Sequence, residues 1–154
     1  MNNKIVLAFS GGLDTSFCVP YLKEKGYEVH TVMVNTGGFS AEEEQAIEER
    51  ALTLGAASHT NVNAVDTYYE KGIRYLIYGN ILKNATYPLS VSSERVFQAL
   101  EVLKHVKKIG AAAVAHGSTG AGNDQVRFDI VFEILAPEVK IIAPVRDECF
   151  TRQF

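Results

Sequence analysis

Residues 4–16 read Lys4-Ile5-Val6-Leu7-Ala8-Phe9-Ser10-Gly11-Gly12-Leu13-Asp14-Thr15-Ser16, and they decide the fold. A short apolar run bounded by Ser-Gly-Gly is typical of a strand buried on both faces of a parallel sheet. After it, Leu13, Phe17 and Tyr21 recur at helical spacing, and Gly26 is placed to end the helix. This stretch therefore predicts the first strand, loop and helix of an α/β domain.

The same alternation continues along the chain. Further strands are expected over residues 28–34, 58–62, 111–115 and 140–143. Helices are expected after a capping box formed by Ser40 and Glu43, around residues 69–77, and from a cap at Ser92 or Ser93 to Lys107-Lys108. This rhythm predicts a doubly wound α/β fold: a mostly parallel, five-stranded sheet with helices on both faces.

Residues 124–135 can be interpreted in two ways. Val126, Phe128, Ile130, Phe132 and Ile134 alternate strictly, and this periodicity alone favours a strand. A parallel sheet, however, needs a crossover helix at this point, and a proline stops the run just before the next strand. We therefore predict a helix.

Two prolines mark local irregularities. Pro20 lies inside the first predicted helix, where it should leave the Ser16 carbonyl unpaired and bend the axis, or begin a new first turn. Pro88 should hold Tyr87 extended within a loop.

Composition limits the class of protein. A chain of 154 residues, 47% apolar, fits one domain with a sizeable core. The net charge of -3 and the lack of a basic run argue against nucleic-acid and membrane partners. Neither a signal peptide nor a run of roughly 20 apolar residues is present, and Cys18 and Cys149 are expected to be reduced, so we predict a cytoplasmic protein. The chain stops at residues 151–154 directly after an apolar strand pattern, which suggests truncation.

The loop from Ser10 to Ser16 has the features of a phosphate site. A helix N-terminus offers unpaired amides and partial positive charge, glycines allow close approach of an anion, and hydroxyls add donors. An ordinary strand-to-helix turn is the simpler alternative, because Ser and Gly are common turn residues. A P-loop and a dinucleotide fingerprint are excluded, since neither pattern occurs at this turn.

A second polar segment, residues 116–128, follows the fourth predicted strand and should face the same crevice. Thr119, Asn123, Asp124 and Arg127 supply a hydroxyl, an amide, a carboxylate and a guanidinium, a set that suits a zwitterionic amino acid. A glycine-rich loop with a helix cap at Asn123 and a surface ion pair is the alternative. His116 adjoins this segment, and it is the histidine most worth testing.

The two segments together resemble a known family. Ser-Gly-Gly-Leu-Asp-Thr-Ser resembles the loop of the ATP pyrophosphatases, which cleave ATP between the α- and β-phosphates. Gly122-Asn123-Asp124-Gln125-Val126-Arg127-Phe128 is similar to the signature of the argininosuccinate synthases, and the similarity runs from residue 4 to about residue 147. The resemblance implies a HUP-type, adenine nucleotide alpha hydrolase-like fold and an AMP-forming ligase of arginine biosynthesis.

Carried over position by position, the resemblance implies three sets of contacts. ATP would be bound by Ala8, Phe9, Ser10, Gly11, Gly12, Leu13, Asp14, Thr15, Ser16, Val34 and Gly117. Citrulline would be bound by Tyr87, Ser92, Asn123 and Arg127, and aspartate by Thr119, Asn123 and Asp124. Mg²⁺ would arrive with ATP rather than in a protein-built site, and no side chain would act as a covalent nucleophile.

The same resemblance implies limits. Ala121 stands where the family usually has Lys, and Val96 follows Arg95 where a Pro is usual. Family members are more than twice as long, so residues 1–154 would form the nucleotide-binding domain without the second domain that completes the site and the homotetramer. We expect such a chain to bind ATP but not to catalyse the full reaction. Alternatives are another ATP pyrophosphatase acting on a base or tRNA uridine, or a non-catalytic nucleotide-binding module.

Overall fold

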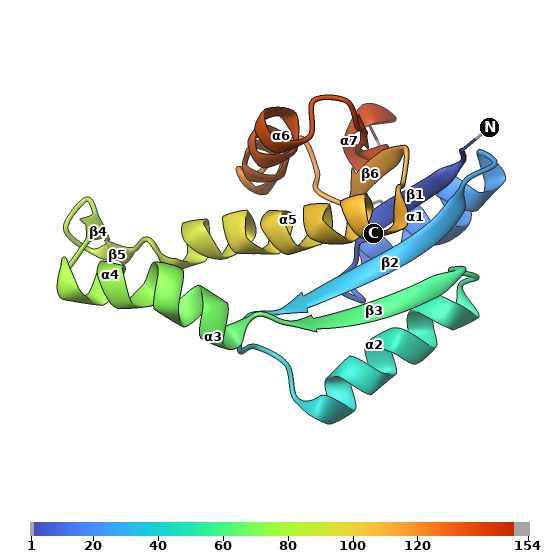
Figure 1. The fold of residues 1–154 in the computed structure, drawn as a ribbon. Helices are drawn as coiled ribbons and strands as arrows, with labels where there is room; N and C mark the ends of the chain where they lie inside the picture. The colour runs from blue at the N-terminus through green and yellow to red at the C-terminus, as the bar shows by residue number, and fades with distance from the viewer. Residues whose placement is uncertain (1, 150–154) are drawn as a thin grey trace.

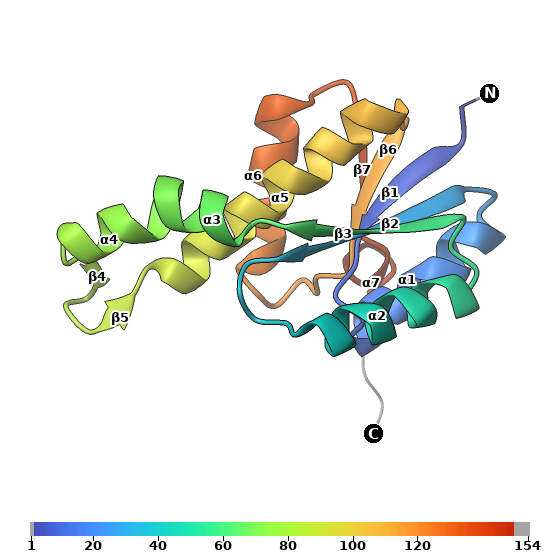
Figure 2. The same ribbon diagram turned by 60° about the horizontal axis from the view of Figure 1, so that its bottom comes forward.

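The structure, a computed structural model, describes residues 2–149. Its main sheet has five parallel strands in the order β3-β2-β1-β6-β7 (Figure 1, with β7 labelled in Figure 2). They are β1 (Lys4–Ala8), β2 (Glu28–Asn35), β3 (Ser58–Asn63), β6 (Ala113–His116) and β7 (Lys140–Ile142). The chain leaves β1 toward β2 and β3 and later returns to the other side of β1 with β6. This reversal beside β1 confirms the predicted doubly wound sheet and places a crevice at the carboxyl ends of β1 and β6.

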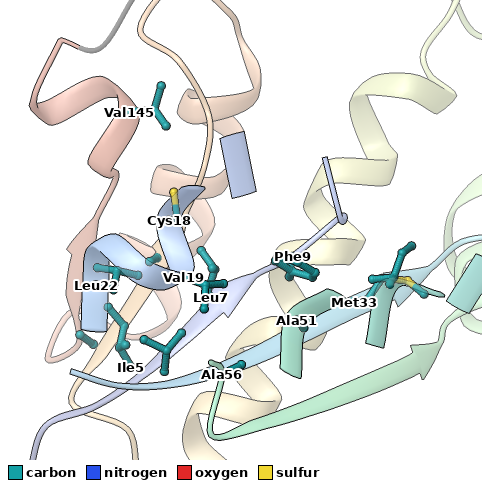
Figure 3. Packing of buried hydrophobic residues seen from close by; sticks show 14 residues of the cluster. Ile5, Leu7, Phe9, Cys18, Val19, Leu22, Met33, Ala51, Ala56 and Val145 are labelled. Carbon is teal, nitrogen blue, oxygen red and sulfur yellow. The ribbon is translucent and has the colours of Figure 1, made fainter. Parts of the chain in front are cut away.

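Helices cover both faces of the sheet (Figure 2). On one face lie α1 (Leu13–Glu24), α2 (Ala41–Thr53) and α7 (Pro144–Asp147), and on the other α5 (Ser90–Ile109) and α6 (Asp124–Leu135). Alternate residues of β1 divide between the two cores, because successive strand side chains point to opposite faces. Ile5 and Leu7 pack with α1, as Figure 3 shows, while Val6 packs with α5 and α6. Each such fully buried side chain stabilises the fold by about 1.5–3 kcal/mol.

Most of the helix and strand boundaries expected from the sequence are found in the structure. Ser40 and Glu43 form the predicted capping box at the start of α2. Gly26, with a φ of +88°, follows the end of α1 as expected. Pro20 lies inside α1, which continues through it, so the alternative of a new first turn is wrong. The strand expected at residue 111 begins two residues later, because the Ala111 amide instead closes the end of α5 by donating to the Val106 carbonyl.

The ambiguous segment is the helix α6. Phe128, Val131 and Phe132 are buried against α5 and the sheet, whereas Ile130 and Ile134 are exposed. The alternating apolar pattern therefore includes residues on both sides of the helix, which explains its strand-like appearance. The prediction of a helix is confirmed.

A helical arm and a small hairpin extend beyond the sheet (Figure 1). The arm contains α3 (Val65–Tyr68), the π-helical turn η1 (Tyr69–Ile73) and α4 (Arg74–Tyr78). The hairpin pairs β4 (Leu82–Lys83) with β5 (Tyr87–Pro88), so the expected loop around residue 87 is a short strand, in which Tyr87 is extended. The arm leads through the hairpin directly into α5.

The predicted cap of α5 is wrong. The helix begins at Ser90, and its N-cap is Leu89, three or four residues before the expected serines. The hydroxyl of Ser93 donates to the Ser90 carbonyl and lies 3.1 Å from the Tyr68 hydroxyl, so this side chain joins the arm to the first turn instead of capping it.

Two further expectations concern the chain as a whole. Cys18 and Cys149 are both free. No helix within the described part of the chain is long and apolar enough to span a membrane. The expectation of truncation at residues 151–154 lies outside the described residues.

Candidate active site

The carboxyl ends of β1, β2 and β6 open on a cavity of about 900 Å³. Its lining comes from the phosphate loop, the end of β2 with the turn after it, one face of α5, and the loop after β6. A ligand site at this place is expected where the strand order of a doubly wound sheet reverses. The two polar segments singled out in the sequence thus face one another across one cavity.

The phosphate loop, residues 10–16, contains the N-terminus of α1, which has no side-chain cap. Gly12 is the N-cap of α1 and has no side chain to cap the helix. The first turn of a helix is a typical binding site for an anion. Hydroxyls are held close by: the Ser10 and Thr15 oxygens lie 3.3 Å apart, and Thr15 donates to the Gly12 carbonyl at 3.2 Å. Amides and hydroxyls in this arrangement are typical of an anion-binding site.

Arg50 holds the backbone of the phosphate loop through a hydrogen bond. Its guanidinium on α2 donates to the carbonyl of Gly11, whose φ is +72°. The Ser16 hydroxyl donates to the same carbonyl at 3.4 Å. Gly11 and Ser16 thus shape the loop, and neither belongs to the lining of the cavity.

Gly117 brings the opposite wall into contact with this loop. A Cβ at Gly117 would lie 3.0 Å from the Thr15 side chain and 3.1 Å from the Thr15 amide nitrogen. Only a glycine allows the backbones of the two loops to approach so closely. The position explains why the residue after β6 must lack a side chain.

His116, the last residue of β6, is buried beneath the same wall. Its Nε2 lies 3.0 Å from Asp129 of α6, and its Nδ1 accepts the Ser118 amide at 3.3 Å. Burial lowers the pKa of His116, an effect that the neighbouring Asp129 carboxylate only partly offsets. The imidazole is therefore neutral at physiological pH.

A second, smaller cavity of about 470 Å³ adjoins the first. Tyr87, Ser92, Asn123 and Arg127 line it, together with residues of the hairpin. The Arg127 guanidinium donates to Asp124 at 2.7 Å and to the Ser92 hydroxyl at 3.0 Å. Asp124 and Ser92 therefore hold the Arg127 guanidinium in one orientation at the wall of this cavity. A guanidinium fork suits bidentate binding of a carboxylate.

Asp124 and Gly122 line both cavities and form the boundary between them. Asp124 also accepts from Arg95 of α5 at 3.2 Å, so two guanidiniums share one carboxylate. Among the described residues that line the larger cavity, Arg95 is the one Lys or Arg side chain, beside the carboxylates of Asp14, Glu94 and Asp124. Position 121, which faces the same cavity, contributes only an alanine methyl.

The structure gathers most of the predicted site residues. The larger cavity is lined by Ala8, Phe9, Ser10, Gly12, Leu13, Asp14, Thr15, Val34, Gly117, Thr119 and Asp124, and the smaller one by Tyr87, Ser92, Asn123, Asp124 and Arg127. Sequence reasoning missed the face of α5 formed by Glu94, Arg95, Gln98 and Val102. The sequence did contain a signal for this face: Glu94, Arg95 and Gln98 recur at helical spacing, which places polar side chains on one side of the helix.

A comparison with known protein families gives a match that includes both polar segments of the site. Residues 4–154 match the family described as the arginosuccinate synthase N-terminal HUP domain. The chain belongs to the argininosuccinate synthase family.

Curated relatives agree. An argininosuccinate synthase of Xanthomonas axonopodis pv. citri is 48% identical over 143 residues, covering 93% of this chain and 34% of the relative. One from Hyperthermus butylicus is 47% identical over 150 residues, covering 97% of this chain and 37% of the relative. The chain therefore spans little more than a third of the length of these argininosuccinate synthases.

Solved structures confirm the HUP-type fold of this argininosuccinate synthase domain at low identity. A predicted subunit of a tRNA methyltransferase from Methanocaldococcus jannaschii has a TM-score of 0.58 at 20% identity, covering 93% of this chain and 68% of its own. NMN synthetase from Francisella tularensis has a TM-score of 0.58 at 10% identity, covering 77% and 46%. Both likenesses concern the arrangement of the sheet and helices.

Proposed function

We propose that this chain binds ATP and forms the nucleotide-binding part of an enzyme that joins citrulline to aspartate. The observation that carries the proposal is the boundary between the two cavities. Asp124 lines both, with the phosphate loop on one side and the Arg127 fork on the other. A nucleotide and an amino acid bound in these cavities would have neighbouring ends.

The larger cavity suits a triphosphate. Its α1 N-terminus, the Ser10 and Thr15 hydroxyls and the close backbone of Gly117 offer donors for phosphate oxygens. Within residues 2–149 no group of three or more His, Cys, Asp or Glu side chains is placed to hold a metal ion together. Mg²⁺ commonly binds through substrate phosphates, and we expect the nucleotide to carry it. The metal would neutralise charge on the departing pyrophosphate.

In the proposed first step, the ureido oxygen of citrulline attacks the α-phosphorus of ATP and pyrophosphate leaves, giving a citrulline adenylate. Arg127, Ser92, Tyr87 and Asn123 would hold citrulline for in-line attack, and the loop amides would stabilise the charge that develops on pyrophosphate. The catalytic contribution of these residues is positioning and charge stabilisation, without a covalent intermediate on the protein.

In the proposed second step, the aspartate amine displaces AMP from the adenylate. Asp124 would accept hydrogen bonds from the ammonium group of aspartate, and Thr119 and Asn123 would donate to its carboxylates. The ammonium would release one proton, so that the free amine forms the new carbon–nitrogen bond as the carbon–oxygen bond to AMP breaks. Because Asp124 lies between the cavities, aspartate would approach the activated carbon from the boundary between nucleotide and citrulline. AMP and argininosuccinate would be the products.

The curated relatives are almost three times as long as this chain, and complete turnover is expected to need residues beyond the site described. Isothermal titration with ATP and Mg²⁺ tests the binding half of the proposal. We expect binding heat and an increase in melting temperature, and the absence of both would contradict ATP binding. Production of argininosuccinate by this chain alone would contradict the expectation of an incomplete site.

Substitutions at the boundary separate the proposal from its alternatives. Asp124→Ala and Arg127→Ala should weaken aspartate and citrulline binding. A non-catalytic nucleotide-binding module would show unchanged affinity for every ligand in both variants. Binding of a tRNA or a free base in preference to the two amino acids would instead favour a different ATP pyrophosphatase.

A further inference from the structure

We propose that His116 is a positioning residue: its neutral Nε2–H tautomer, fixed by Asp129, holds the loop of residues 117–119 against the phosphate loop through the Ser118 amide. The inference deepens the proposed function, because Gly117 and Thr119 of this loop are expected to meet ATP and aspartate. His116 acts through the backbone of its neighbours.

The tautomer follows from the partners of the two ring nitrogens. A backbone N–H can only donate, so the Nδ1 atom that receives the Ser118 amide at 3.3 Å must carry a lone pair. The Asp129 carboxylate accepts, so Nε2, at 3.0 Å from it, must carry the proton. Protonation of Nδ1 would break the bond to Ser118.

Asp129 is itself fixed from a third element. Its second carboxylate oxygen receives the Arg146 guanidinium of α7, and Arg146 also donates through Nε to Asp147 at 2.9 Å. Asp147 in turn accepts the Ala143 amide at 2.9 Å. Four side chains from β6, α6 and α7 thus form one line of hydrogen bonds that ends on the Ser118 amide.

Packing leaves the imidazole little freedom to turn. Only 1% of the His116 surface is exposed, and the Phe128 ring stacks on it with centroids 5.5 Å apart and planes 15° apart. The ring also contributes to the lining of the larger cavity. A group that only filled space here would not need two oriented polar contacts.

The two contacts can be separated by substitution. In His116→Asn the amide oxygen replaces Nδ1, so the bond to Ser118 can persist while the bond to Asp129 is lost. In His116→Gln the amide nitrogen replaces Nε2, so the bond to Asp129 can persist while the bond to Ser118 is lost. Each variant loses one hydrogen bond, and both should have similar melting temperatures.

Titration with ATP and Mg²⁺ and hydrogen exchange at the Ser118 amide distinguish the variants. We expect His116→Asn to keep a protected Ser118 amide and an ATP affinity within about twofold of the parent. His116→Gln should lose the protection and about five- to tenfold in affinity, the size of one net hydrogen bond. His105→Asn, at a histidine of α5, is the matched control and should change neither. Equal Ser118 protection in the two His116 variants would overturn the inference.

A measurement on the unsubstituted chain decides the tautomer even if a variant does not fold. Nitrogen-15 chemical shifts of the His116 ring should show a proton on Nε2 and none on Nδ1, and a proton on Nδ1 would overturn the inference. These shifts and the Ser118 exchange rate need no ligand. If the chain failed to bind ATP, the proposed function would fail while the role of His116 in the loop would still be decided.

Discussion

The two sides of the site are held in different ways. The phosphate wall, residues 10–16 and 117–119, is held by backbone contacts, buried neighbours and the end of β6. The amino-acid wall, formed by Ser92, Arg95, Asn123, Asp124 and Arg127, is held by ion pairs between partly exposed side chains. Under the proposed function, the first wall would bind its ligand without rearrangement, whereas the second would have to exchange internal ion pairs for contacts with a ligand. Affinity at the second wall reflects the difference between two sets of similar bonds.

The largest effect is expected from Gly117→Val, which separates the two loops of the phosphate wall. A β-carbon here would lie 3.0–3.2 Å from atoms of Thr15 and Asp14, two of them backbone atoms that cannot move aside. Displacement of the loop should remove about two hydrogen bonds to the charged phosphates and reduce ATP affinity on the order of 100-fold. Isothermal titration measures the loss. Gly120→Ala in the same loop is the control, because its nearest neighbour would be the Arg146 side chain at 3.7 Å; equal binding by the two variants would show that close approach is unimportant.

Arg127→Ala should reduce citrulline affinity by about ten- to thirtyfold, because charge-assisted hydrogen bonds are stronger than neutral ones. Arg127→Lys should recover little of it, since an ammonium lacks the guanidinium fork that now reaches Asp124 and Ser92. ATP affinity should stay within about twofold, which titration of each ligand checks. Arg74→Ala, at an exposed ion pair of the arm, is the control. A parallel loss of ATP binding in Arg127→Ala would show that the two walls are not independent.

The same contrast explains what could be predicted from the sequence. Three local features were predicted correctly because they depend on neighbours within a few residues. They are the strand from Lys4, the turn of residues 10–12 that follows it, and the capping box at Ser40. The α5 cap was mispredicted because Ser93 bonds to Tyr68, 25 residues away. The role of Arg95 was missed for the same reason, since its partner Asp124 lies 29 residues away and meets it only where α5 packs on α6.

Arg95→Met tests the cation of the larger cavity with a smaller expected effect. Aspartate brings two carboxylates into a cavity that already holds Asp14, Glu94 and Asp124, and the change removes the guanidinium that offsets them. Aspartate affinity should fall by about five- to tenfold. Arg127 still pairs with Asp124, so citrulline affinity should fall less. An unchanged dissociation constant for aspartate would place its carboxylates away from Arg95.

Acid should weaken the phosphate wall through His116. Burial lowers the pKa of this imidazole below its usual 6.5, although Asp129 and Asp147 oppose the shift and Arg146 adds to it. The unfolded chain therefore binds a proton at a higher pH than the folded chain, and stability is lost as pH falls below about 6.5. Melting temperatures should decrease through this range by a few degrees, and less steeply in His116→Asn. If melting temperature fell equally steeply with pH in the parent and in His116→Asn, the loss of stability would belong to other titrating groups.

The smallest effect is expected from Ala121→Lys, which adds a cation to the lining of the larger cavity at the position where the resemblance expects a lysine. A lysine there adds a second cation beside three carboxylates and should raise ATP affinity about threefold, because an exposed charge is strongly screened. Titration at low and high salt checks both the gain and its electrostatic origin, since a gain due to charge should diminish as salt increases. Ala57→Lys, at an exposed position outside the cavity lining, adds the same charge to the chain. An equal gain of ATP affinity in Ala57→Lys would mean that net charge attracts the nucleotide. No gain of ATP affinity in Ala121→Lys would mean that the amides and hydroxyls of the phosphate wall already satisfy the triphosphate.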